Sequence, residues 1–127
     1  MKATIWVICI SLVLVMGMGI TTSILSSHVA RDYAELAEQL EDLVREEEWD
    51  EARKLLNKIE VRWEDTCQWL QFWVNHGDTD DVNLGLGQMD VGIELKNIWI
   101  CLTAGAELRE SFRHLYHRDA LTLSNIL

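Results

Sequence analysis

The chain has 127 residues, a formal net charge of −10 and 49% hydrophobic residues. This length allows a single domain with one modest hydrophobic core. The acidic balance excludes nucleic acid as an expected partner, because phosphates repel acidic surfaces, and it favours basic protein surfaces or cations.

An uncharged apolar segment covers residues 3–25. As a helix it would measure roughly 35 Å, whereas the hydrocarbon core of a bilayer is about 30 Å thick. Cleavable signal sequences have a shorter apolar core of about 7–15 residues, and the cleavage points after Ser27 and Ala30 are poor. We therefore predict that residues 1–27 form a retained single-pass transmembrane anchor. A secreted helical ligand-binding domain, released by signal cleavage, is the alternative.

The charges that flank this segment predict its orientation. Lys2 and the amino terminus are positive, whereas Arg31 on the other side is followed at once by Asp32 and then by Glu35. The positive-inside tendency therefore places the amino terminus in the cytoplasm. All 21 acidic residues lie beyond the anchor, so residues 28–127 are expected to form an acidic extracytoplasmic domain at the cell membrane.

Small residues recur four positions apart in the predicted anchor. Gly17 pairs in this way with Thr21, and Gly19 pairs with Ser23. Such pairs let two transmembrane helices approach closely, which suggests a homo-oligomer or docking to another membrane protein. A plain lipid-facing helix is an equally good interpretation.

The predicted fold class is all-α, with the transmembrane helix followed by an antiparallel bundle of about four helices and a C-terminal tail. Proline is absent and no linker composition interrupts residues 28–127. The first bundle helix, expected over 28–47, can continue directly from the anchor. Its apolar stripe has helical spacing and consists of Tyr33, Leu36, Ala37, Leu40, Leu43 and Val44.

The second bundle helix has the strongest apolar pattern in the chain. It is expected to follow a turn at 46–48 with Asp50 as its N-cap, and Gly77 is expected to end it. Asp78, Thr79 and Asp80 then cap the next helix. The stripe predicts a core helix and consists of Trp49, Ala52, Leu56, Ile59, Trp63, Thr66, Leu70 and Trp73. Residues 33–73 could also form a tetratricopeptide-like hairpin, but such repeats need about three copies to stack.

The third helix, expected over 79–95, contains Gly85, Gly87 and Gly92. Each glycine costs about 1 kcal/mol relative to alanine inside a helix, so close backbone packing is one use for them. A break at Lys96–Asn97 should precede a fourth helix over 97–117. The side chains that this helix is expected to bury are Ile98, Leu102, Leu108, Phe112 and Leu115.

The end of the chain resembles a known family. A His-Leu step at 114–115 and a closing Leu-x-Leu-x-Asn-Ile at 121–126 are similar to the bacterial domain of unknown function 4363 family. The resemblance continues through the anchor and through Trp49-Asp50-Glu51-Ala52, Trp63, Trp73 and His76. It implies a short, membrane-anchored helical protein of the cell envelope of spore-forming Gram-positive bacteria, with no established activity and no assigned catalytic residues.

His114 and His117 are the weak metal-ligand candidates, because they are three residues apart and could share a helix face. Zinc needs three or four ligands, and the nearby carboxylates are only Glu107, Glu110 and Asp119. We therefore favour a helix-end role, and we expect no metal and no other cofactor. A metal-dependent enzyme that uses His114 and His117 is kept as an alternative.

Surface recognition is the remaining possibility. Trp69 and Phe72 lie off the centre of the second stripe and form a candidate exposed patch. Cys67 and Cys101 lie in apolar stretches, so buried free thiols are favoured over a disulfide. Phosphate loops, nucleophile elbows and zinc-protease motifs are absent from the sequence. We therefore predict a structural or protein-binding accessory module and no enzyme.

Overall fold

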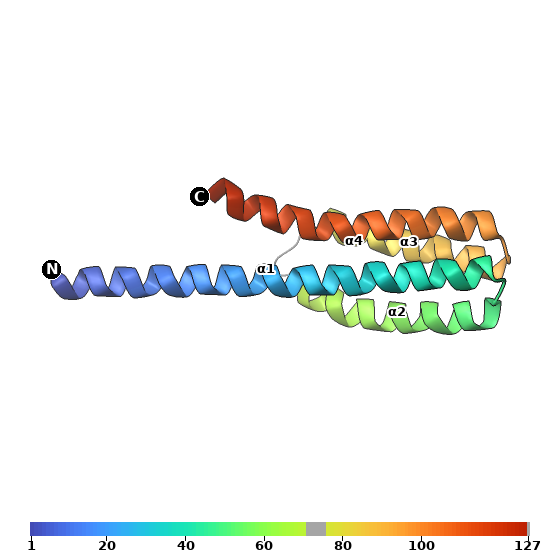
Figure 1. Ribbon diagram of the computed structural model, residues 1–127, viewed down its shortest axis with the longest axis horizontal. Helices are drawn as coiled ribbons and strands as arrows, with labels where there is room; N and C mark the ends of the chain where they lie inside the picture. The colour runs from blue at the N-terminus through green and yellow to red at the C-terminus, as the bar shows by residue number, and fades with distance from the viewer. Residues whose placement is uncertain (71–75, 127) are drawn as a thin grey trace.

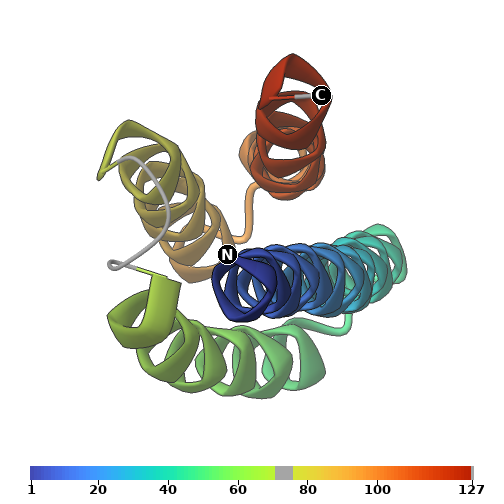
Figure 2. The same ribbon diagram turned by 90° about the vertical axis from the view of Figure 1, so that its left-hand side faces the viewer.

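The computed structural model describes the backbone of residues 1–70 and 76–126, and the side chains of 22, 23, 26 and 116–126 lie outside the description. Within these ranges the chain is helical apart from two short turns, which confirms the all-α prediction there. Figure 1 shows successive helices running in opposite directions, and Figure 2 places α1 between α2 and α4. The helices are α1 (Lys2–Arg45), α2 (Trp49–Leu70), α3 (His76–Glu94) and α4 (Ile98–Ile126).

Helix α1 is one unbroken helix of 44 residues with two different halves. Its first half, Lys2–Thr21, has a mean hydropathy of 2.4, and none of its most apolar window is buried. Its second half packs into the bundle (Figure 1). The first half is long and apolar enough to be a single-pass membrane anchor, and a signal sequence has the same properties.

The core forms where the apolar stripes of the four helices meet. The stripes predicted for α1 and α2 are confirmed among the described residues, because every apolar member is buried or packs against the core. In α4 the predicted burial is confirmed for Leu108, Phe112 and Leu115. Ile98 and Leu102 are only partly buried, and in that part of the helix Cys101 and Ala104 are buried instead. The fully buried core side chains of α1 and α2 are Tyr33, Ala37, Leu40, Val44, Ala52, Leu56, Ile59 and Trp63.

The predicted break at Lys96–Asn97 is confirmed. Lys96 has a φ of 50°, and the N–H of Asn97 donates to the carbonyl of Gly92 (2.9 Å), which closes the end of α3. The Asn97 side chain then accepts from the N–H of Ile100 (3.1 Å) and caps α4. A second turn of the same kind occupies residues 46–48, as expected.

Several predicted helix ends are wrong. Asp50 lies in the first turn of α2 instead of capping it, because the chain enters α2 directly from the turn at 46–48. Gly77 lies in the first turn of α3 and does not end α2. Helix α4 continues to Ile126, so the expected tail is helical; no glycine or proline follows Gly105 to end it. Trp73 lies outside the described residues.

Two glycines of α3 allow close packing against α4. A Cβ at Gly92 would lie 2.6 Å from Cys101 Sγ and 3.0 Å from the Cys101 backbone nitrogen, and a Cβ at Gly85 would lie 2.8 Å from a Leu108 methyl carbon. The prediction of close backbone packing is therefore confirmed for these two. It is wrong for Gly87, which is exposed with open space around it.

The same substitution should therefore have opposite effects at two positions of α3. Gly92→Ala is expected to lower the free energy of unfolding by about 1–3 kcal/mol, because α4 must move away from the new methyl group. Gly87→Ala should raise it by up to about 1 kcal/mol through helix propensity alone. Urea denaturation of both variants in detergent measures the difference, and equal effects would contradict this packing.

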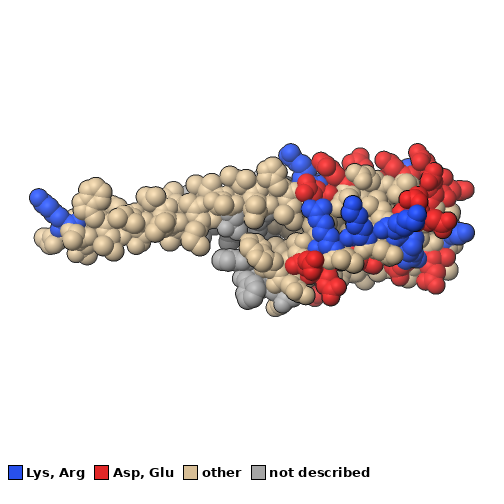
Figure 3. Space-filling view, turned by 90° about the horizontal axis from the view of Figure 1, so that it is seen from below, with Lys and Arg blue, Asp and Glu red and all other residues tan. Residues whose placement is uncertain are grey.

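Charged side chains gather on the bundle, whereas the apolar half of α1 carries them only at its tip (Figure 3). One ion pair has a buried carboxylate: Glu41 of α1, with a side chain 5% exposed, lies 3.2 Å from Nε of Arg109 on α4, whose side chain is 34% exposed. Gly105 makes room for this carboxylate, since a Cβ there would overlap it. An ion pair between Arg53 and Asp90 links α2 to α3 closer to solvent.

Glu60 should make the stability of the bundle depend on pH. Burial raises the pKa of Glu60, the Asp90 charge raises it further, and Arg53 opposes both. The folded state therefore holds this proton more tightly than the unfolded state, and ionising Glu60 costs stability as the pH rises. Glu60→Gln should stabilise the protein by less than about 1 kcal/mol at neutral pH. The gain should shrink in acid; a gain that is constant between pH 4 and pH 7 would argue against this assignment.

Candidate functional site

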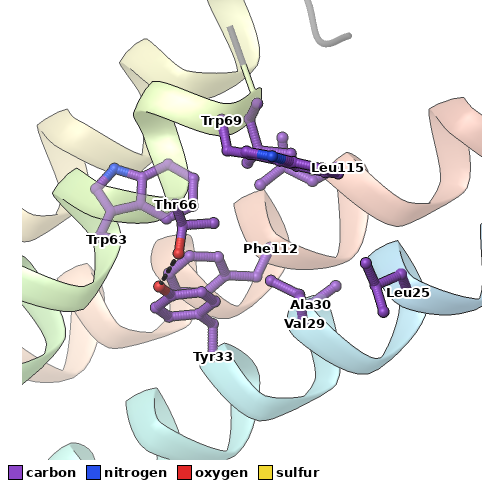
Figure 4. Close-up of a pocket in the computed structure, with 10 residues that line it drawn as sticks. Leu25, Val29, Ala30, Tyr33, Trp63, Thr66, Trp69, Phe112 and Leu115 are labelled. Atoms are coloured by element: carbon purple, nitrogen blue, oxygen red, sulfur yellow. Dashed lines mark hydrogen bonds between the residues drawn. The ribbon is translucent and has the colours of Figure 1, made fainter. Parts of the chain in front are cut away.

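An apolar pocket of about 140 Å³ opens at the end of the bundle that is nearer the exposed half of α1. Three helices build it, and their contributions come from parts of the sequence that are far apart (Figure 4). We call it the Tyr33 pocket. Its lining consists of Leu25, Val29, Ala30 and Tyr33 from α1, Trp63, Thr66, Trp69 and Leu70 from α2, and Phe112 and Leu115 from α4.

Three aromatic rings form one wall of the Tyr33 pocket (Figure 4). Tyr33 stacks on Phe112 with ring centroids 5.0 Å apart and an interplanar angle of 19°. Trp63 meets both rings edge-on, at 5.5 Å from Tyr33 and 5.6 Å from Phe112. Such offset and edge contacts are favourable, so this wall is rigid and links α1, α2 and α4.

The polar atoms in this wall satisfy one another. The Thr66 hydroxyl donates to the carbonyl of Arg62 (2.8 Å), so it must accept from the Tyr33 hydroxyl at 2.6 Å. Burial raises the pKa of the Tyr33 phenol, which stays neutral at physiological pH. The Arg62 guanidinium lies 5.2 Å from the Tyr33 ring centroid and pairs with Asp32. The Tyr33 pocket therefore suits an apolar ligand.

Trp69 belongs to the mouth of this pocket. It is 57% exposed, and its ring lies beside Leu115 in Figure 4. Leu25, which is 53% exposed, is at the other side of the mouth. A role for Trp69 in partner binding stays a prediction, and Phe72, the other member of the predicted patch, lies outside the described residues.

The small-residue pairs of the predicted anchor lie on α1 beyond the bundle. No atom outside the helix lies within 4 Å of a Cβ built on Gly17, and the Thr21 hydroxyl donates to the Gly17 carbonyl (2.8 Å). Gly19 belongs to the same exposed half, and only the backbone of Ser23 is described. Their proposed role in association stays a prediction.

Of the two histidine candidates, only the side chain of His114 is described, and it lies beside a single carboxylate. His114 is exposed, and its Nε2 lies 3.3 Å from Glu110 Oε1 one turn earlier. The His117 side chain is outside the description. Among the described side chains, no group of three or more histidine, cysteine, aspartate or glutamate residues could hold a metal ion.

All three cysteines are free. Cys101 is buried and Cys67 is partly buried, as expected, and Cys9 is exposed on the apolar half of α1. Burial raises the pKa of the Cys101 thiol, so this group packs as a small apolar side chain.

Sequence reasoning missed two features of this site. Tyr33, Trp63 and Phe112 were expected only as core residues, and Leu25 only as part of the anchor; nothing in the periodicity marks a cavity between them. The buried pair of Glu41 with Arg109 was missed as well. The sequence signal for it is weak, since Glu41 merely follows Leu40 at the edge of an apolar stripe.

These features define a class: an acidic all-helical bundle continuous with an exposed apolar N-terminal helix, with an apolar pocket at their junction. The family model of a domain of unknown function, DUF4363, matches residues 20–126, so the chain belongs to the domain of unknown function 4363 family. The resemblance noted in the sequence is thereby confirmed. Neither the curated proteins nor the solved structures contain a match to the chain.

Proposed function

We propose that this protein is a single-pass membrane protein with its amino terminus in the cytoplasm and its bundle outside. In this proposal the bundle is a structural or protein-binding accessory module of the cell envelope, with no catalytic activity. The family resemblance supports an envelope protein of a spore-forming Gram-positive bacterium. The observation that carries the proposal is the continuity of α1, in which an exposed apolar half and a buried half form one helix.

The apolar half of α1 must be shielded from water by another molecule or by a membrane. An exposed helix face of this length and hydropathy is far larger than the apolar patches that soluble monomers tolerate. Two of its hydroxyls are satisfied within the helix, as a hydrocarbon environment requires: Ser11 and Thr21 each donate to the carbonyl four residues earlier at 2.8 Å. A bilayer is the simplest cover that meets both conditions.

The Tyr33 pocket favours a retained anchor over a cleaved signal sequence. Cleavage after Ser27 would remove Leu25 from the lining, and cleavage after Ala30 would remove Val29 and Ala30 too. It would also shorten α1 just before Tyr33, the residue that joins the aromatic wall. Retention keeps the pocket complete.

The topology can be tested in cells with a cysteine at the far turn of the bundle. Glu46→Cys, made together with Cys67→Ser, should react with a membrane-impermeant maleimide in intact cells, whereas Ala3→Cys in the same Cys67→Ser background should react only after lysis. The chain should also stay in the membrane fraction after an alkaline wash. A soluble mature chain that begins near Ser27 would instead establish the secreted alternative.

Association through the anchor gives a second prediction. In native membranes, cross-linking of the chain to itself or to another membrane protein should fall when Gly17→Leu blocks close helix approach. Val15→Leu, on the same exposed half of α1, is the matched control and should leave the cross-links unchanged. Equal yields from both variants would mean that the Gly17–Thr21 pair plays no part.

A further inference from the structure

We propose that the Tyr33 pocket binds a short stretch of one acyl chain of a membrane phospholipid. This inference rests on the proposed membrane anchoring, because only an anchored bundle holds the pocket next to lipid. It goes further than the anchoring proposal because it assigns a ligand to the Tyr33 pocket, a feature that membrane anchoring by itself does not require.

The lining selects the chemical class of the ligand. None of the ten lining residues is charged, and the only two hydroxyls in the wall, those of Tyr33 and Thr66, are hydrogen-bonded to each other at 2.6 Å. A polar ligand would lose hydrogen bonds to water and find few partners there, because the remaining polar groups of the lining are the indole N–H groups of Trp63 and Trp69 and the Trp63 N–H already donates to Asn83. Apolar protein cavities of about 150 Å³ accept molecules the size of benzene, so the volume here suits a short stretch of hydrocarbon chain.

The position of the mouth identifies the source of that chain. Leu25 is the last residue of the uncharged apolar segment 3–25, so it marks the outer end of the stretch that can lie in hydrocarbon. The next charged side chain is Arg31, six residues or about 9 Å further along a helix. The mouth would therefore lie at the boundary between the hydrocarbon and the headgroups, where an acyl chain can reach it.

Two residues beside the pocket match the groups that lie next to an acyl chain in a bilayer. Trp69 is more than half exposed at the mouth, and tryptophan is enriched at the boundary between lipid and water. Arg31, the first cation after Lys2, immediately follows the lining residue Ala30 and is exposed. A guanidinium at this level of α1 carries the charge and the donors that a lipid phosphate binds.

Photolabelling in nanodiscs tests this assignment. The full-length protein is placed in nanodiscs made of phosphatidylcholine, and this lipid carries a photoreactive diazirine on its acyl chain. Irradiation followed by peptide mapping should place label on residues 63–70 and 112–115, as well as on the apolar half of α1. A lipid that only surrounds the anchor would label residues 2–25 alone. That second pattern would overturn the acyl-chain site and leave the anchor proposal intact, whereas failure to enter nanodiscs would overturn both.

A variant in which a larger side chain fills the Tyr33 pocket provides the matched comparison for the photolabelling. Ala30→Phe should abolish label on 63–70 and 112–115 while label on 2–25 persists. Ala106→Phe adds the same ring at an exposed position of α4 and should leave the pattern unchanged. Thermal melting of both variants checks whether they fold. If Ala30→Phe does not fold, the positions of the photolabel in the unaltered protein still show whether lipid enters the Tyr33 pocket. Cross-links between two copies through residues 63–70, without lipid label, would assign the pocket to a second chain and overturn the proposal.

Discussion

Phe112→Ala is expected to lower the free energy of unfolding by about 3–5 kcal/mol. Phe112 is 1% exposed and contacts both other rings of the aromatic wall, so its removal deletes two ring contacts and leaves a cavity between three helices. Most domains are stable by only about 5–15 kcal/mol, so the variant should be close to unfolding at physiological temperature. Urea titration in detergent, followed by tryptophan fluorescence, measures the effect.

Trp99→Ala is the control for this prediction. Trp99 is a larger aromatic residue on the same helix but is 80% exposed, so its loss should change the stability by no more than about 0.5 kcal/mol. If both variants lost the same stability, the aromatic wall would not be the centre of the fold. The comparison also shows whether the wall of the Tyr33 pocket is a structural element.

Arg109→Met should cost about 3 kcal/mol, because it leaves the Glu41 carboxylate buried without its cation. Methionine keeps the apolar stem of the arginine, so the loss reports the charge and not the packing. Adding Glu41→Met should restore stability to within about 1 kcal/mol of the parent protein, since two apolar residues of similar volume can replace a buried pair. Denaturation of the two single variants and the double variant completes the cycle.

Arg113→Met, one turn further along α4, is the matched control. Its ion pair with Glu110 is 3.8 Å long, and both side chains are more than half exposed, so the expected cost is below about 1 kcal/mol. An equal loss from Arg109→Met and Arg113→Met would show that burial of Glu41 contributes nothing. A failure of the double variant to recover would point instead to a specific role of the pair in the register of α1 against α4.

The apolar stripes of α1 and α2 could be predicted from the sequence because helical periodicity is a local property. The stripe of α4 could be predicted only in part. Leu108, Phe112 and Leu115 are buried as predicted. Nearer the start of the helix, Cys101 and Ala104 are buried in place of the larger Ile98 and Leu102. The reason lies on α3: Gly92 brings its backbone against Cys101, and a larger side chain at 101 would separate the helices.

Residue order alone predicts the two parts of the protein, an apolar N-terminal segment and an acidic helical domain, together with the family to which it belongs. These can be predicted because hydropathy, helical spacing and turn residues act over a few positions. The folded structure adds that α1 is unbroken, that Glu41 meets Arg109, and that three distant segments enclose the Tyr33 pocket. These features depend on how helices far apart in the chain align, and that alignment is set by the sum of many packing contacts and not by any local pattern.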